Sequence, residues 1–172
     1  MAASRKIDAA APEAFVIERT FDAPRALMWK LWTDPAHLAR WWGPKGFTVS
    51  HCKVDLRPGG IFHYGLRSPD GQEIWGKFVY REIVTPERMV YVVSFSDADG
   101  GITVHPMNPT WPRQIFSTTT FVEKDGKTTV TVRWSPFEAT RKEVDTFEAG
   151  RESMRQGFTG TFDQLETYLQ SL

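Results

Sequence analysis

Few side chains in this sequence have the types and spacing that chemistry needs. Its four histidines show neither a His-x-x-x-His nor a Cys-x-x-Cys pattern, so no metal site is predicted at His37, His51, His63 or His105. Cys52 follows His51, but neighbours on a strand point to opposite faces, so the two cannot act as a pair. A lone thiol in a strand is usually a small core residue. Cys52 is therefore not expected to be a nucleophile.

Glu82 and His63 are the two candidates for acid/base chemistry. Glu82 falls in Arg81-Glu-Ile83, near the expected centre of a sheet. If it is buried there, its pKa would be raised and Arg81 or Arg133 would have to pair with it. The other interpretation is an exposed carboxylate in a cross-strand ion pair. Both stay open, and no residue is assigned a catalytic role.

Composition and charge exclude several classes of function. The 172 residues are 41% hydrophobic and 24% charged with zero net charge, which is typical of one globular, soluble domain and argues against binding nucleic acid or anionic membranes. The single cysteine allows no intrachain disulfide. The sequence has no secretory signal, no apolar run long enough to span a membrane and no phosphate or dinucleotide motif, because Gly59-Gly60 reads as a turn. We expect a cytoplasmic protein without a cofactor.

Strand patterns with strong turn signals fill the middle of the chain. Ser68-Pro-Asp-Gly71 and Lys124-Asp-Gly-Lys127 are such turns, and they predict an antiparallel meander. Residues 1–14 are expected to be a loose tail before one domain over 15–172. Seven strands are predicted, at Phe15–Phe21, Phe47–Leu56, Ile61–Arg67, Glu73–Val84, Arg88–Phe95, Ile115–Glu123 and Thr128–Ser135.

A helix of about 30 residues is predicted to end the chain. Thr140-Arg-Lys-Glu143 is a capping box at its start, and apolar residues then recur at intervals of three and four. Its single apolar stripe should lie across one face of the curved sheet, which gives an α+β fold. Gly150, Gly157 and Gly160 indicate either close approach of helix and sheet or space above a cavity floor.

Four of the seven tryptophans fall between the first two predicted strands, on two short helices. Asp34 before Pro35 is a good N-cap for the second of these helices. Trp29 and Trp32 are expected to pack into the core. Trp41 and Trp42 are adjacent, so they point about 100° apart on a helix. One can face inward while the other meets a pocket mouth or a partner.

Aromatic side chains alternate along the predicted strands and could line a wedge between sheet and helix. Phe62, Tyr64 and Leu66 share one face of a strand. The wedge would be either a ligand cavity or a filled core. The long loop Ser96–Gln114 carries Trp111, which could cover the cavity mouth or pack on the edge of its own sheet.

Several motifs, in this order, resemble the START-like, helix-grip superfamily called SRPBCC. They are Asp22-Ala-Pro-Arg, Trp32-Thr-Asp-Pro, Trp41-Trp-Gly-Pro, Asp55-Leu-Arg-Pro-Gly-Gly60, Arg81-Glu-Ile83 and the Thr161–Leu165 region. The chain is most similar to the bacterial branch related to the C-terminal domain of the activator of the heat-shock-ninety chaperone ATPase. The resemblance implies a curved seven-stranded sheet gripping the C-terminal helix. It departs from many members at Phe158, where they carry tryptophan after the glycine.

The resemblance also implies a function, namely non-catalytic binding of a small hydrophobic or amphipathic molecule. Two alternatives are kept: a module that binds a chaperone or other protein, connected with stress response, and an enzyme acting on a bound hydrophobic substrate. We expect a monomer or homodimer. The residues expected to bind the ligand are Trp41, Trp42, Phe62, Tyr64, Trp75, Phe78, Tyr91, Trp111, Phe158 and Phe162.

Overall fold

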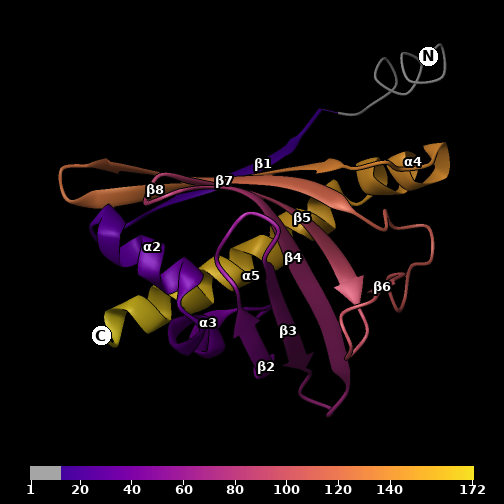
Figure 1. Cartoon of the computed structure of the whole chain (residues 1–172), viewed down its shortest axis with the longest axis horizontal. Helices are drawn as coiled ribbons and strands as arrows, with labels where there is room; N and C mark the ends of the chain where they lie inside the picture. Colours follow the sequence, from indigo (N-terminus) through magenta and orange to yellow (C-terminus); the bar gives the residue numbers. More distant parts are fainter. Residues whose placement is uncertain (1–12) are drawn as a thin grey trace.

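A computed structural model describes residues 13–172, so most of the expected tail over 1–14 lies outside the described residues. Its helices and strands follow the predicted order (Figure 1). The elements are β1 (Phe15–Phe21), α2 (Arg25–Thr33), α3 (Pro35–Trp41), β2 (Thr48–Val54), β3 (Ile61–Arg67), β4 (Glu73–Val84), β5 (Arg88–Ser96), β6 (Ile102–Thr103), β7 (Ile115–Lys124), β8 (Lys127–Pro136), α4 (Arg141–Ala149) and α5 (Arg151–Gln170).

All strand pairs are antiparallel, and the sheet order is β1-β8-β7-β5-β4-β3-β2, with the two-residue β6 beside β5. The predicted meander is confirmed from β2 onward, and β1 returns to the edge of β8. The sheet curves, and α5 crosses its concave side (Figure 1). The predicted α+β helix-grip architecture is therefore confirmed.

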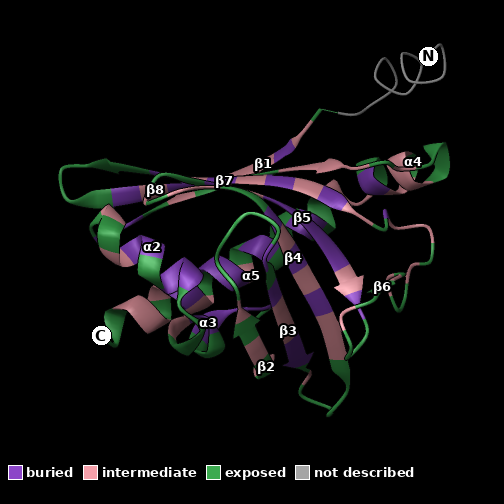
Figure 2. Cartoon of the chain, in the orientation of Figure 1, coloured by how far each residue is buried: buried purple, intermediate pink, exposed green. Residues whose placement is uncertain are grey.

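The short helices α2 and α3 close one end of this arrangement. Asp34 caps α3 as predicted, since its carboxylate accepts the Ala36 N–H at 2.9 Å and Pro35 occupies the first turn. Pro24 is the N-cap residue of α2. Buried residues concentrate on the inward sides of these helices and of α5 (Figure 2). Trp29 and Trp32 belong to the core, as predicted.

The expected continuous C-terminal helix is interrupted at Gly150, which separates α4 from α5. The capping box is present: Thr140 Oγ1 accepts the Glu143 N–H, and the Glu143 carboxylate accepts the Thr140 N–H. A Cβ at Gly150 would lie 2.9 Å from the Trp111 indole, so the loop before β7 presses against the helix junction. This tertiary contact, rather than a proline, marks the break.

We expect Gly150→Ala to destabilise the protein by about 1–3 kcal/mol, because the added methyl group overpacks against Trp111. Gly160→Ala is the matched control: its Cβ would meet Lys45 only at 3.5 Å, and alanine favours helix by about 1 kcal/mol. Urea unfolding of both variants measures the difference. Equal stability of Gly150→Ala and wild type would show that the loop carrying Trp111 can move away from the added methyl group without an energetic cost.

Two buried tyrosines on neighbouring strands offer a second matched pair. The Tyr91 hydroxyl bonds the Thr119 hydroxyl at 2.8 Å, whereas the buried Tyr80 hydroxyl has no partner within residues 13–172. An unpaired buried hydroxyl is destabilising, so Tyr80→Phe should raise the free energy of unfolding by about 1 kcal/mol. Tyr91→Phe should lower it by about the same amount. Chemical denaturation of both variants tests this, and a loss of stability in Tyr80→Phe would contradict it.

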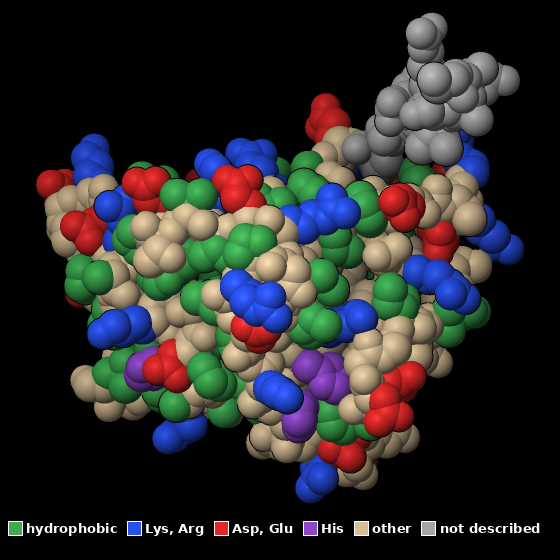
Figure 3. Space-filling model, viewed as in Figure 1, with side chains coloured by type: hydrophobic (Ala, Val, Ile, Leu, Met, Phe, Trp, Pro, Cys, Tyr) green, Lys and Arg blue, Asp and Glu red, His purple; other side chains and the backbone are tan. Residues whose placement is uncertain are grey.

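The surface carries no dominant charge on the face shown in Figure 3, where acidic and basic side chains alternate. Within residues 13–172, no helix combines the length and apolar character needed to cross a membrane.

Candidate ligand-binding site

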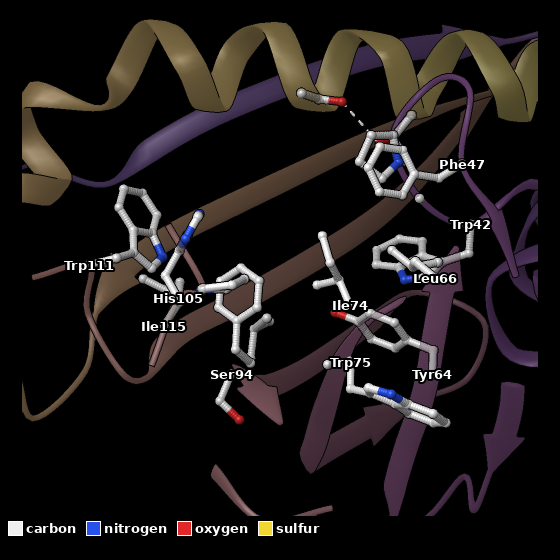
Figure 4. A pocket seen from close by; sticks show the side chains of 18 of the residues that line it. Trp42, Phe47, Tyr64, Leu66, Ile74, Trp75, Ser94, His105, Trp111 and Ile115 are labelled. Carbon is white, nitrogen blue, oxygen red and sulfur yellow. Dashed lines mark hydrogen bonds between the residues drawn. The ribbon is translucent and has the colours of Figure 1, made fainter. Parts of the chain in front are cut away.

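A cavity of about 460 Å³ lies between the concave face of the sheet and α5. Its floor consists of residues from β3, β4 and β5, and α5 lies across its top (Figure 4). The volume falls within the range of about 300–1,000 Å³ found for small-molecule sites. Of the two interpretations of the wedge, filled core or cavity, the structure has the cavity.

One end of the cavity is formed by the segment after α3. Trp42, Phe47, Tyr64 and Leu66 gather there (Figure 4). Gln164 on α5 holds this segment, since its side-chain amide donates to the Gly43 carbonyl at 2.8 Å and to the Pro44 carbonyl at 3.1 Å. The helix and the short-helix segment are thereby fixed relative to each other at this end.

The loop before β7 closes the other end of the cavity. His105, Trp111 and Ile115 lie there in Figure 4. Trp111 packs on Phe147 of α4 with ring centroids 5.8 Å apart, and Thr110 bonds Thr146 at 2.8 Å. Trp111 therefore borders the cavity while it is anchored to α4, a contact that neither interpretation of this loop included.

The side of α5 that faces the cavity presents Met154, Gly157, Phe158 and Thr161, a helical stripe with spacing of three and four. Gly157 lies at the exposed edge of this stripe, and no atom outside its own stretch of helix backbone would come within 4 Å of a Cβ placed there. The three glycines thus differ: Gly150 reflects close approach, Gly160 makes ordinary contact, and Gly157 leaves open space at the cavity.

Six of the residues expected to bind a ligand border the cavity: Trp42, Tyr64, Trp75, Phe78, Trp111 and Phe158. Trp75 differs from the others because its indole stacks on His63, with centroids 5.2 Å apart, and lies beside His51. Strand alternation places these rings on the outer face, where histidine side chains gather over β2 and β3 in Figure 3. The Trp75 ring is thus directed away from the cavity, as Figure 4 also shows.

The other four expected residues lie in the core and do not line the cavity: Trp41, Phe62, Tyr91 and Phe162. Trp41 is 1% exposed, and its indole N–H donates to the Leu31 carbonyl at 2.9 Å. Tyr91 stacks on Phe78 at 4.0 Å, behind the cavity surface. These residues position the lining rather than form it.

The burial of Trp41 and Trp42 corrects a second expectation. Both were candidates for an exposed docking surface, but they are only 1% and 8% exposed. Their rings pack against each other and against Trp32. No apolar patch can form from these two indoles, so any chaperone contact would have to use other residues.

Several lining residues were not predicted as ligand contacts. Leu66, Ile74, Val93 and Phe95 could have been found, because strand alternation puts them on the same face as Tyr64 and Phe78. Phe47, His105, Ile115, Trp134 and Met154 come from other elements, and only the tertiary arrangement brings them to the cavity.

The candidates for acid/base chemistry lie away from this site. Glu82 is exposed and forms an ion pair with Arg88, which is the simpler of the two interpretations. His63 faces the outer side, where its Nε2 lies 3.1 Å from the Asp97 carbonyl oxygen. Burial, helped by the charge of Asp34, raises the pKa of Cys52 to about 11, which disfavours the thiolate. Within the described residues, no group of His, Cys, Asp or Glu side chains could hold a metal ion.

One protein family matches most of this chain. A family model described as "Activator of Hsp90 ATPase homolog 1-like protein" matches residues 22–170. No curated protein matches the chain. The family match leaves out β1 but covers the other strands and α5, and therefore every residue that lines the cavity.

Solved structures with the same fold come from several bacteria. A solution structure from Arthrobacter aurescens has a TM-score of 0.75 at 25% identity, over 92% of this chain and 87% of that chain. A crystal structure from Mycobacterium smegmatis has a TM-score of 0.71 at 24% identity, over 92% and 96%. The AHSA1 protein from Silicibacter pomeroyi has a TM-score of 0.65 at 17% identity, over 91% and 97%.

Proposed function

Because this chain belongs to the family of Activator of Hsp90 ATPase homolog 1-like proteins, of the SRPBCC type, we propose that it binds a small hydrophobic or amphipathic molecule without chemically changing it. The observation that carries the proposal is the cavity of about 460 Å³ beneath α5. Most of its lining is apolar or aromatic, and burial of apolar ligand surface contributes about 25 cal/mol per Å².

Gly157 supports a ligand more than it supports a packing defect. A glycine inside a helix costs about 1 kcal/mol relative to alanine. No neighbouring atom would clash with a Cβ at position 157, so close packing does not explain why this residue is glycine. The glycine leaves space for something other than the protein itself, at the exposed edge of the helical stripe that borders the cavity.

The proposal can be tested with purified protein and a neutral fluorescent probe, N-phenyl-1-naphthylamine. We expect a saturable rise in fluorescence at one probe per chain. Native mass spectrometry of protein isolated from its own host should show an added small-molecule mass that disappears on denaturation. Unsaturable probe fluorescence together with a mass equal to that of the bare chain would refute the proposal.

A chaperone partner is the second candidate, and it is favoured by the family description alone. Co-purification with a heat-shock-ninety chaperone and stimulation of its ATPase would support it. With Trp41 and Trp42 buried, substitutions at these positions should affect such binding only through stability. On the same family grounds we propose a cytoplasmic protein connected with stress response.

A further inference from the structure

Two indole N–H groups among the side chains of the cavity wall lack a protein acceptor. The indole nitrogens of Trp42 and Trp134 are buried and have no partner within residues 13–172. Trp42 lies at the end of the cavity next to Tyr64, and Trp134 packs against Phe158 of α5. A buried N–H without an acceptor is destabilising. Both nitrogens have almost no accessible surface, so a ligand in the cavity would meet the Tyr64 hydroxyl beside Trp42 rather than these N–H groups.

Tyr64 places a hydroxyl donor at the cavity. Its phenol lies over Gly76, where a Cβ would come within 2.5 Å of the hydroxyl oxygen, so the glycine makes room for the ring. Burial and the neighbouring Tyr91 raise the pKa of Tyr64 well above its ordinary value. The hydroxyl therefore keeps its proton and can donate it. In Figure 4 it points toward the middle of the cavity.

His105 adds a donor at the opposite end. Its Nδ1 accepts the Met107 N–H at 3.0 Å, which leaves the proton of the neutral ring on Nε2. Burial lowers the pKa of His105, so the ring is neutral at pH 7. Each end of the cavity thus carries a polar side chain that is uncharged at pH 7.

Cations do not contribute to the lining. Within the described part of the chain, no Lys or Arg borders the cavity. The one acidic residue that does, Glu73, accepts the Ser50 hydroxyl at 2.7 Å and lies 3.7 Å from Arg67. An anionic head group placed among these side chains would be desolvated without a counter-charge, which is strongly unfavourable.

We infer that the cavity accepts a neutral, largely apolar molecule carrying a hydrogen-bond acceptor oxygen, and that the Tyr64 hydroxyl donates to that oxygen. This inference rests on the proposed function and narrows it: fatty acids and other carboxylates are disfavoured, and carbonyl compounds or ethers are favoured. Tyr64 is the specificity-determining residue.

Three probes of similar shape test the inference: 2-acetylnaphthalene, its alkene isostere 2-isopropenylnaphthalene, and the anion 2-naphthoate. Each displaces N-phenyl-1-naphthylamine from the protein at pH 7. Wild type should bind the ketone at least about tenfold more tightly than the anion. Tyr64→Phe should weaken ketone binding about tenfold, or 1.4 kcal/mol, and change alkene binding by less than about twofold.

Two further variants separate the possible outcomes. Tyr80→Phe removes a hydroxyl that does not line the cavity, so it should leave all three affinities unchanged. Gly157→Trp adds an indole at the exposed edge of the cavity, where it should block ligand binding. If Gly157→Trp abolishes binding but Tyr64→Phe weakens ketone and alkene equally, or if the anion binds as tightly as the ketone, only this inference is overturned. If no probe displaces the dye, or if Gly157→Trp binds like wild type, the proposed function fails too.

Discussion

Gly157→Trp is expected to weaken binding of N-phenyl-1-naphthylamine at least about a hundredfold, or 2.7 kcal/mol, while the protein stays folded. Position 157 is at the exposed edge of the cavity-facing stripe of α5, and the space around a Cβ there is open. An indole attached at this point would occupy much of a cavity of about 460 Å³. It would compete directly with any ligand for the same volume.

Gly157→Trp should raise the free energy of unfolding although it weakens probe binding. Replacing a helical glycine removes a penalty of about 1 kcal/mol, and the new ring buries apolar surface. Fluorescence titration and urea unfolding of the same preparation measure both quantities. Loss of binding with retained or increased stability cannot be explained by misfolding.

A graded series provides the controls for Gly157→Trp. Gly157→Ala should stabilise the protein by about 1 kcal/mol and weaken probe binding only a few-fold, because a methyl group removes little volume. Gly160→Ala should give a similar stabilisation without any effect on binding, since Gly160 does not line the cavity. Binding by Gly157→Trp that matches wild type would locate the probe elsewhere and remove the cavity as the site.

The fold was predictable because its signals are local. Turn sequences such as Ser68–Gly71 and the capping box at Thr140 determine where strands and helices begin and end, and the structure confirms them. The break at Gly150 was not predictable from periodicity, because the apolar spacing continues through it. It depends on Trp111, which arrives from a different loop.

The candidate site was predictable only along single strands. Alternation correctly groups Tyr64 with Leu66, yet residue type alone also selected Trp75, whose ring stacks on His63 on the outer face. Aromatic character does not distinguish a residue on the cavity surface from one behind it, as Phe78 and Tyr91 show. Trp134 reaches the cavity from β8, and no local pattern connects it with Tyr64.

Trp32→Ala is expected to lower the free energy of unfolding by about 3–5 kcal/mol, a large part of the about 5–15 kcal/mol typical of a whole domain. Trp32 is 2% exposed. Its ring lies edge-on to four aromatic rings from α3, the segment after it, β7 and α5, with centroid distances of 5.1–6.5 Å to Trp41, Trp42, Phe121 and Phe162.

Trp32→Phe is the matched control, and it also separates packing from hydrogen bonding. The Trp32 indole N–H is buried without a partner within residues 13–172, so phenylalanine removes an unsatisfied donor while it keeps an aromatic ring. Trp32→Phe should lower the free energy of unfolding by less than about 2 kcal/mol. Because Trp42 packs on Trp32 and lines the cavity, Trp32→Ala should also weaken probe binding at temperatures where the variant is still folded. Unfolding curves and probe titrations that agree between Trp32→Ala and Trp32→Phe would contradict the view that this ring supports the cavity wall.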